Sequence, residues 1–171
     1  MIYPIVRYGQ PVLEEKAEEI MEFDTPELHQ LVEDMFESMY AARGVGLAAP
    51  QIGIGKRMAV IDTTIGEEQG QKIVLINPRI VHREGSQKGE EGCLSLPKFR
   101  EQVSRPRKVI VQARNAEGAE FEMIGEDLLA RAFLHETDHL DGTLYISHIS
   151  ALKRDLIRRK VRKLQKAGEW G

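Results

Sequence analysis

The chain has 171 residues, of which 42% are hydrophobic and 30% are charged, and its formal net charge at pH 7 is -3. This composition indicates a folded, water-soluble protein and excludes disordered and collagen-like chains, while Cys93, the only cysteine, excludes an intrachain disulfide. The sequence has no signal-peptide pattern and no apolar run near the ~18 residues that a membrane span needs. We therefore expect one domain, residues 1–171, in the cytoplasm and away from membranes.

The first predicted element is an amphipathic helix that begins near Pro26. Asp24 or Thr25 can cap its N-terminus, and proline is favoured in the first turn of a helix. Apolar side chains recur at steps of three and four residues and form one stripe, which we expect to pack in the core. The stripe consists of Leu28, Leu31, Val32, Met35, Phe36 and Met39.

The middle of the chain is predicted to form short strands that are rich in valine and isoleucine and are separated by glycine, proline and asparagine. Residues 66–70 and 115–118 have the composition of hairpin turns. No alternating β-α-β units occur, so antiparallel pairing is favoured. The predicted strands are 57–61, 72–76, 79–82, 108–113 and 119–124.

Two helices are predicted after these strands, one over residues 126–140, which ends before Gly142, and one that begins near residues 147–150. We therefore expect an α+β fold with mostly antiparallel sheets around a central helix, residues 126–140, and with a C-terminal helix. Residues 151–171 hold eight basic residues against two acidic ones. This charge indicates either a polyanionic partner or a solvated helix face, and the sequence leaves both open.

The central helix carries the motif His135-Glu136-Thr137-Asp138-His139. Side chains four residues apart leave a helix about 40° apart in projection, so both imidazoles can bind one metal ion, and the carboxylate of Glu136 can reach a bound water. Leu128, Ala132 and both histidines follow one stripe, which we expect to face inward. The alternative is two histidines that pack on one helix face without a metal.

A catalytic metal site of this kind needs a third protein ligand and an open position. Two candidates are present: His148, downstream of the motif, and Cys93, upstream in Glu91-Gly92-Cys93-Leu94-Ser95-Leu96-Pro97. The glycine and the proline of this segment favour a shaped loop over a buried, inert thiol. Glu91 and Arg105 flank the Cys93 loop, and we expect them to form an ion pair that holds it, with two separately solvated charges as the alternative.

A second segment, Gly44-Val45-Gly46-Leu47-Ala48-Ala49-Pro50-Gln51, is rich in small residues that permit close contact with a ligand. It lacks the Gly-Lys-Ser/Thr ending of a phosphate-binding loop, and a tight helix-to-strand turn is the alternative interpretation. Gln51 at its end can donate a hydrogen bond to a developing oxyanion.

The three segments together resemble peptide deformylase, whose members carry Gly-x-Gly-x-Ala-Ala-x-Gln, Glu-Gly-Cys-Leu-Ser and His-Glu-x-Asp-His-Leu-x-Gly in that order. Every fixed position is filled here, in residues 44–51, 91–95 and 135–142. Leu134 departs from the pattern, since many members have glutamine there, but it lies outside the residues expected to bind metal. The sequence is similar to the bacterial-type branch over nearly its whole length.

The resemblance implies a metalloamidase that hydrolyses the N-formyl group of the initiator N-formylmethionine of nascent polypeptides and releases formate. It implies Cys93, His135 and His139 as ligands of Fe2+, which Zn2+, Ni2+ or Co2+ can replace, and Glu136 as the catalytic acid and base. The other residues that it implies are the oxyanion donors Gln51 and Leu94 (backbone N–H) and the substrate-binding residues Val45, Gly46, Gly92, Arg100, Leu128 and Ala132.

The implied partner is the formylated nascent polypeptide. The basic C-terminal helix is then expected to dock on the ribosome, and DNA is not expected as a partner. Two other classes of function share these features. One is a metalloprotease or a different amidase with the same ligands, and the other is a structural metal module that binds nucleic acid through the basic tail. Three protein ligands rather than four argue against a closed structural site.

Overall fold

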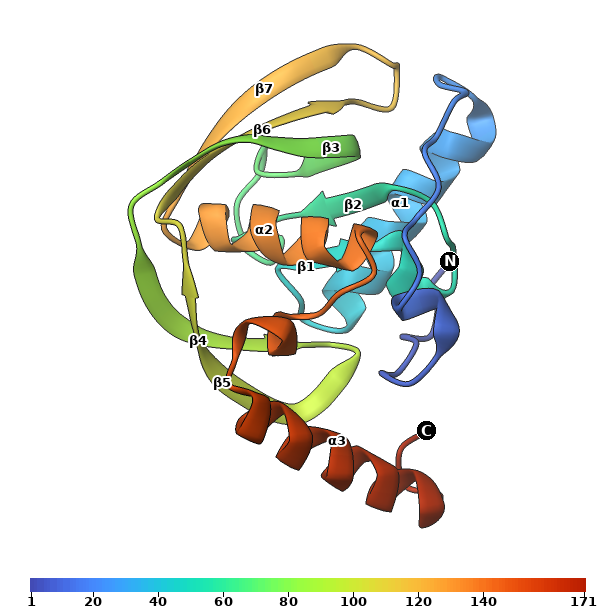
Figure 1. Cartoon of the computed structure of the whole chain (residues 1–171). Helices are drawn as coiled ribbons and strands as arrows, with labels where there is room; N and C mark the ends of the chain where they lie inside the picture. Colours follow the sequence, from blue (N-terminus) through green and yellow to red (C-terminus); the bar gives the residue numbers. More distant parts are fainter.

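The structure, a computed structural model that describes residues 1–171, has helix α2 (Leu128–Leu140) between two antiparallel sheets (Figure 1). The smaller sheet is a long hairpin of β4 (Gln87–Cys93) and β5 (Leu96–Arg105). The larger sheet has the strand order β1-β2-β3-β6-β7. Its strands are β1 (Gly46–Ala48), β2 (Met58–Ile61), β3 (Ile73–Glu84), β6 (Lys108–Arg114) and β7 (Glu120–Glu126). This arrangement confirms the predicted α+β fold around a central helix.

Helix α1 (Pro26–Ala41) begins where the sequence predicts. The Thr25 hydroxyl accepts a hydrogen bond from Leu28 N at 3.1 Å, which satisfies one of the free donors of the first turn. The Ser150 hydroxyl caps the C-terminal helix α3 (Ala151–Lys166) in the same way. Three short 3-10 helices connect the larger elements: η1 (Pro11–Leu13), η2 (Ala49–Ile52) and η3 (Tyr145–His148).

The rotation of α2 is fixed by its packing against the larger sheet. Phe133 is fully buried in a core cluster with Leu75 of β3 and Val109 of β6. Gly125 of β7 makes room for the ring, because a Cβ atom at this position would lie 2.6 Å from Phe133 Cε2. Since α2 cannot rotate about its axis without losing this packing, His135 and His139 are held toward the β4–β5 hairpin.

The prediction of two strands over 72–76 and 79–82 is wrong, because one strand, β3, runs through both. The pairing of β3 with β6 shifts register between Ile76 and Arg79, so Asn77 and Pro78 form an irregularity inside the strand. Proline cannot donate to a sheet, and a bulge accommodates it. Asn77 has a φ of 51°, and its side chain accepts a hydrogen bond from Ile20 N at 2.9 Å.

The two segments predicted as loops also contain strands. Residues 46–48 form β1 at the edge of the larger sheet, and Glu91 to Cys93 end β4. Leu128 departs from the expected inward stripe, because its side chain is 52% exposed, whereas Ala132 and His139 are buried as expected. Leu128 is the first residue of α2, where the helix emerges from between the sheets.

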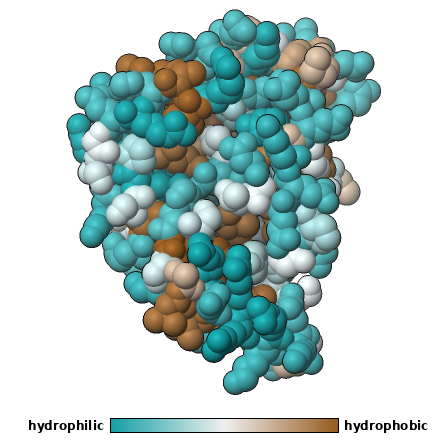
Figure 2. Space-filling view, viewed as in Figure 1, coloured by the Kyte–Doolittle hydropathy of each residue, from teal (hydrophilic) through white to brown (hydrophobic).

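None of the helices combines the length and the apolar character that a membrane crossing requires. The face shown in Figure 2 is largely hydrophilic, with smaller hydrophobic areas at the upper left, near its centre and at the lower left, where α3 begins. Leu152 and Leu156 of α3 contribute exposed apolar surface, with exposed fractions of 72% and 48%. The basic residues predicted on this helix are mostly exposed beside them.

Candidate active site

A groove of about 580 Å³ lies between β1, the β4–β5 hairpin and α2. The chain segments that form its walls are far apart in the sequence, and the central helix brings them together. All but one of the site residues expected from the sequence line it, and the exception, His139, is fully buried beneath it. The expected residues in the lining are Val45, Gly46, Gln51, Gly92, Cys93, Leu94, Arg100, Leu128, Ala132, His135 and Glu136.

A candidate metal centre lies at the inner end of this groove. The ligand atoms of Cys93, His135 and His139 all lie within 4.8 Å of one another, and Cys93 Sγ is 3.2 Å from His139 Nε2. His148, the other candidate for third ligand, lies outside this cluster, and its Nε2 is 2.9 Å from Asp138 Oδ2. The structure therefore brings together the thiol and the two histidines of the helix.

The donor set fits a divalent transition metal. A thiolate and two imidazoles are ligands that zinc and iron accept, and a set of three protein ligands would leave a coordination position for water or substrate. Burial lowers the pKa of His139 well below its usual value, so the ring is neutral, which is the form that binds metal.

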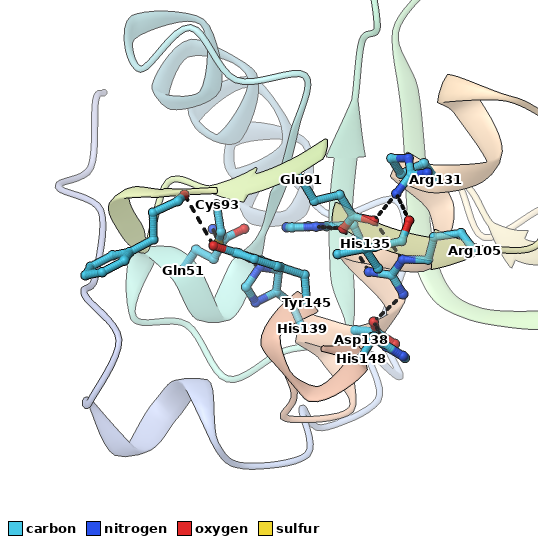
Figure 3. Close-up of polar contacts among 12 residues, drawn as sticks. Gln51, Glu91, Cys93, Arg105, Arg131, His135, Asp138, His139, Tyr145 and His148 are labelled. Atoms are coloured by element: carbon cyan, nitrogen blue, oxygen red, sulfur yellow. Dashed lines mark hydrogen bonds and ion pairs between the residues drawn. The ribbon is translucent and has the colours of Figure 1, made fainter. Parts of the chain in front are cut away.

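A buried ionic network holds the first histidine of the motif (Figure 3). His135 Nδ1 is 2.9 Å from Glu91 Oε1. The other ring nitrogen, Nε2, is therefore free to face the candidate metal centre. Arg105 donates two hydrogen bonds of 2.9 Å to the two oxygens of Glu91, as the predicted ion pair requires, and Arg131 donates a third. Burial alone would raise the pKa of Glu91, but the hydrogen bonds from Arg105 and His135 outweigh it and hold this pKa far below its usual value.

Glu136 lies beside the group of possible metal ligands, Cys93, His135 and His139. Its carboxylate forms no hydrogen bond with the rest of the protein. Its side chain is 3% exposed, and its Oε1 atom is buried without a hydrogen-bond partner. Burial raises the pKa of this carboxyl to about 7. A carboxyl with a pKa near neutrality can both accept and donate a proton at physiological pH.

The Gln51 side chain is fixed by both ends of its amide. Its Oε1 accepts a hydrogen bond from Ala48 N at 3.0 Å, and its Nε2 donates to Ser95 Oγ at 3.2 Å and lies 3.5 Å from Cys93 Sγ. The amide N–H₂ group therefore points toward Cys93 and the candidate metal centre. The Leu94 backbone follows Cys93 directly on the same wall of the groove.

Three further residues that support the site are not among those predicted from the sequence. Arg131 and Asp138 belong to the ionic network, in which Asp138 accepts from Arg105 Nη1 at 2.7 Å. Tyr145 stacks on the ring of His135, with centroids 6.2 Å apart and planes at 20°. Helical spacing could have found Arg131 and Asp138, because they lie four residues before and three residues after His135.

The chain matches the family model described as "Polypeptide deformylase" over residues 2–155. A relative from Acidobacterium capsulatum, named peptide deformylase, is 63% identical over 170 residues, which are 99% of each chain. Another from Thermodesulfovibrio yellowstonii, with the same name, is 49% identical and covers 93% of this chain and 96% of its own. The solved structure of a peptide deformylase from Legionella pneumophila matches with a TM-score of 0.89 at 42% identity and covers 98% of both chains.

The resemblance of the three sequence motifs is thus confirmed over the length of the chain, and it favours an amidase over the protease and nucleic-acid alternatives. The chain belongs to the peptide deformylase family, the metal-dependent hydrolases that remove the formyl group from nascent polypeptides.

Proposed function

We propose that Cys93, His135 and His139 hold one divalent metal ion and that Glu136 carries the proton while the formyl group is hydrolysed. The observation that supports this most directly is the convergence of the three ligand atoms beside a buried, unpartnered carboxylate oxygen. When bound, a divalent ion acts as a Lewis acid toward water and toward the formyl carbonyl.

The protein groups divide the remaining work among them. Glu136 takes a proton from the attacking water and then gives it to the nitrogen of the leaving amine. The side-chain amide of Gln51 and the backbone N–H of Leu94 donate hydrogen bonds to the oxyanion that develops on the formyl oxygen. The carboxylate of Glu91 is engaged by Arg105 and Arg131, and it orients the ring of His135 through Nδ1.

The substrate binds along the groove as an additional strand. Its backbone pairs with that of Val45, Gly46 and Gly92, which lie on facing walls. The methionine side chain packs against Leu128 and Ala132, where the exposed Leu128 offers apolar surface. Arg100 flanks the peptide farther out.

A methyl group at Gly46 is expected to reduce turnover about 100-fold. A Cβ atom there would lie 2.9 Å from Glu136 Cδ and closer still to Oε2, so the carboxylate has to move, and a shift of about 1 Å in a catalytic group can cost that much. The measurement is the rate of formate release from a formyl-methionyl peptide by Gly46→Ala protein. Gly55→Ala is the matched control, because a Cβ atom at Gly55 meets nothing within 4 Å. Equal rates in the two variants would contradict the proposed place of Glu136.

We further propose Fe2+ as the physiological ion, as membership of the family implies, although the donor set alone also suits zinc. A thiolate beside ferrous iron and open water is prone to oxidation. Protein purified without oxygen should lose formate-releasing activity on exposure to air, while nickel- or cobalt-loaded protein keeps it. Parallel samples held under argon serve as the control. Equal air stability of all metal forms would count against iron.

The exposed basic face of α3 supports docking on ribosomal RNA. Charge reversal at Arg159, Lys160 and Lys163, all exposed, should weaken co-sedimentation with ribosomes at least about tenfold at low salt. Turnover of short formyl peptides should not change, since these residues lie outside the groove. Unchanged ribosome binding would leave a solvated helix face as the explanation of the charge.

We also propose that residues 1–171 act as one domain in the cytoplasm, where nascent chains emerge. Contacts between distant parts of the chain support the first point: Trp170 is 6% exposed, and its Nε1 donates to Tyr8 O at 2.8 Å. Tyr8 N in turn donates to Ser95 O at 2.7 Å, beside the metal ligand Cys93.

A further inference from the structure

Two cations at the rim of the groove have no counter-ion in the structure. Arg43 precedes β1, and Lys98 lies on β5. Both side chains line the groove and are exposed, and neither forms an ion pair within 4.0 Å. Because the whole chain has a net charge of -3, this positive rim is a local feature and not part of a generally basic surface.

The other charges of the groove are already neutralised. Arg100 pairs with Glu90 on the neighbouring strand. The buried Arg131 pairs with Glu91. Glu136 is buried at the inner end. The excess charge that a bound peptide meets at the rim is therefore that of Arg43 and Lys98.

The backbone at both positions is unusual for these residue types. Arg43 has a φ of 57° and Lys98 a φ of 72°, in the left-handed region that glycine and asparagine favour. Lys98 lies in a bulge, because the register of the hairpin jumps from the pair Gly92 and Arg100 to the pair Cys93 and Leu96. Local backbone preference does not account for long cationic side chains at these two positions, and such outliers point to a function.

The two positions line the groove from different chain segments, the one that precedes β1 and strand β5. Gly44, next to Arg43, packs against the side chain of Leu94, since a Cβ atom at Gly44 would lie 2.9 Å from Leu94 Cδ1. Lys98 lies four residues after Leu94, on the wall that carries the bulge. A peptide that pairs with the backbone of Val45, Gly46 and Gly92 therefore runs along a groove whose lining includes both cations.

We propose that Arg43 and Lys98 select nascent chains with acidic side chains in the residues that follow formyl-methionine. This inference rests on the peptide path given under the proposed function. The two cations are specificity-determining residues, and they take no part in the chemistry, because they do not touch the metal cluster. An exposed ion pair changes affinity about two- to fivefold, so the two together should give a preference of about tenfold.

The test compares the kcat/KM of three peptide amides: formyl-Met-Asp-Asp-Ala, formyl-Met-Ser-Ser-Ala and formyl-Met-Lys-Lys-Ala. The unmodified protein is expected to prefer the acidic peptide over the basic one about tenfold at low salt, and salt at about 0.5 M should remove most of this difference. The preference should appear in KM and not in kcat, because the cations bind substrate and transition state equally.

Substitutions at these positions can change the charge without straining the backbone. Asparagine and aspartate are enriched in the left-handed region, so the double variants Arg43→Asn with Lys98→Asn, and Arg43→Asp with Lys98→Asp, are expected to fold. The first should hydrolyse all three peptides alike, and the second should prefer the basic peptide. Lys166→Asp, at an exposed residue of α3 outside the groove, gives the same change in net charge as the asparagine double variant, and Lys163→Asp with Lys166→Asp gives the same change as the aspartate double variant.

Hydrolysis of the serine peptide separates this inference from the proposed function. If that peptide is hydrolysed by every variant, the chemistry stands whatever the charge preference. A ratio of acidic to basic peptide at or below one in the unmodified protein, or a ratio that the double variants do not change, overturns the role of Arg43 and Lys98.

Discussion

Replacement of Glu136 by glutamine is expected to reduce kcat for formate release by about 1,000-fold. Glutamine has the same shape but can neither accept the proton of water nor deliver it to the leaving amine, and a positioned acid or base contributes about 10² to 10⁴ in rate. Because Glu136 lies outside the proposed set of metal ligands, the variant should bind as much metal as the unmodified protein.

The same change should not lower the melting temperature. Glu136 is 3% exposed, and its Oε1 has no partner, so the charged form is costly to bury. A glutamine there removes this cost. Replacement of a catalytic carboxylate commonly leaves stability unchanged or raises it, at the expense of activity. Glu122→Gln, at an exposed position of β7, is the matched control and should leave both quantities unchanged. Parental turnover by a metal-loaded Glu136→Gln protein would remove Glu136 from the mechanism.

Replacement of Glu91 by glutamine is expected to destabilise the protein by about 3 to 5 kcal/mol, the range for breaking a buried ion pair. Arg105 and Arg131 are only 4% and 8% exposed, and both lose their shared counter-ion. For a chain of this size that corresponds to a melting temperature lower by roughly 10 °C. The His135 ring also loses its charged acceptor, so metal affinity should fall about 10- to 100-fold.

Glu90 offers a control one residue away. Its ion pair with Arg100 lies on the surface, with side-chain exposures of 53% and 63%, so Glu90→Gln should change stability by less than about 1 kcal/mol. Equal melting temperatures for the two variants would show that the buried network around Glu91 adds no more stability than the surface ion pair of Glu90. Since the pKa of Glu91 is held below its usual value of 4.5, its contribution is present above that pH and is lost on acidification.

The parts of the site that depend on local spacing could be predicted from the sequence. His135 and His139 lie four residues apart on one helix, and Glu136 between them follows from the same geometry. The start of α1 at Pro26 was also predictable, because a capping hydroxyl and a proline mark it in the sequence.

The parts that depend on pairing between distant segments could not be predicted. Cys93 ends strand β4, whose partner β5 has few apolar residues that would identify it as a strand. The β4–β5 hairpin depends on the pairing of these two strands and not on a local pattern in either one. The network around Glu91 unites residues up to 47 positions apart, from Glu91 to Asp138, and no local pattern encodes such a contact. The sequence predicts two strands in place of β3, because proline normally ends a strand and the bulge that accommodates Asn77 and Pro78 depends on β6.

We propose that one metal ion, held by Cys93, His135 and His139, supports removal of the formyl group. The most direct measurement is formate release from a formyl-methionyl peptide by anaerobically purified protein, followed as metal is added back to the stripped chain and bound metal is counted. We expect activity to rise in proportion to bound metal and to level off at one ion per chain, and we expect Cys93→Ala protein to show neither binding nor activity. Full formate release by metal-stripped protein, or by Cys93→Ala protein, would contradict the claim.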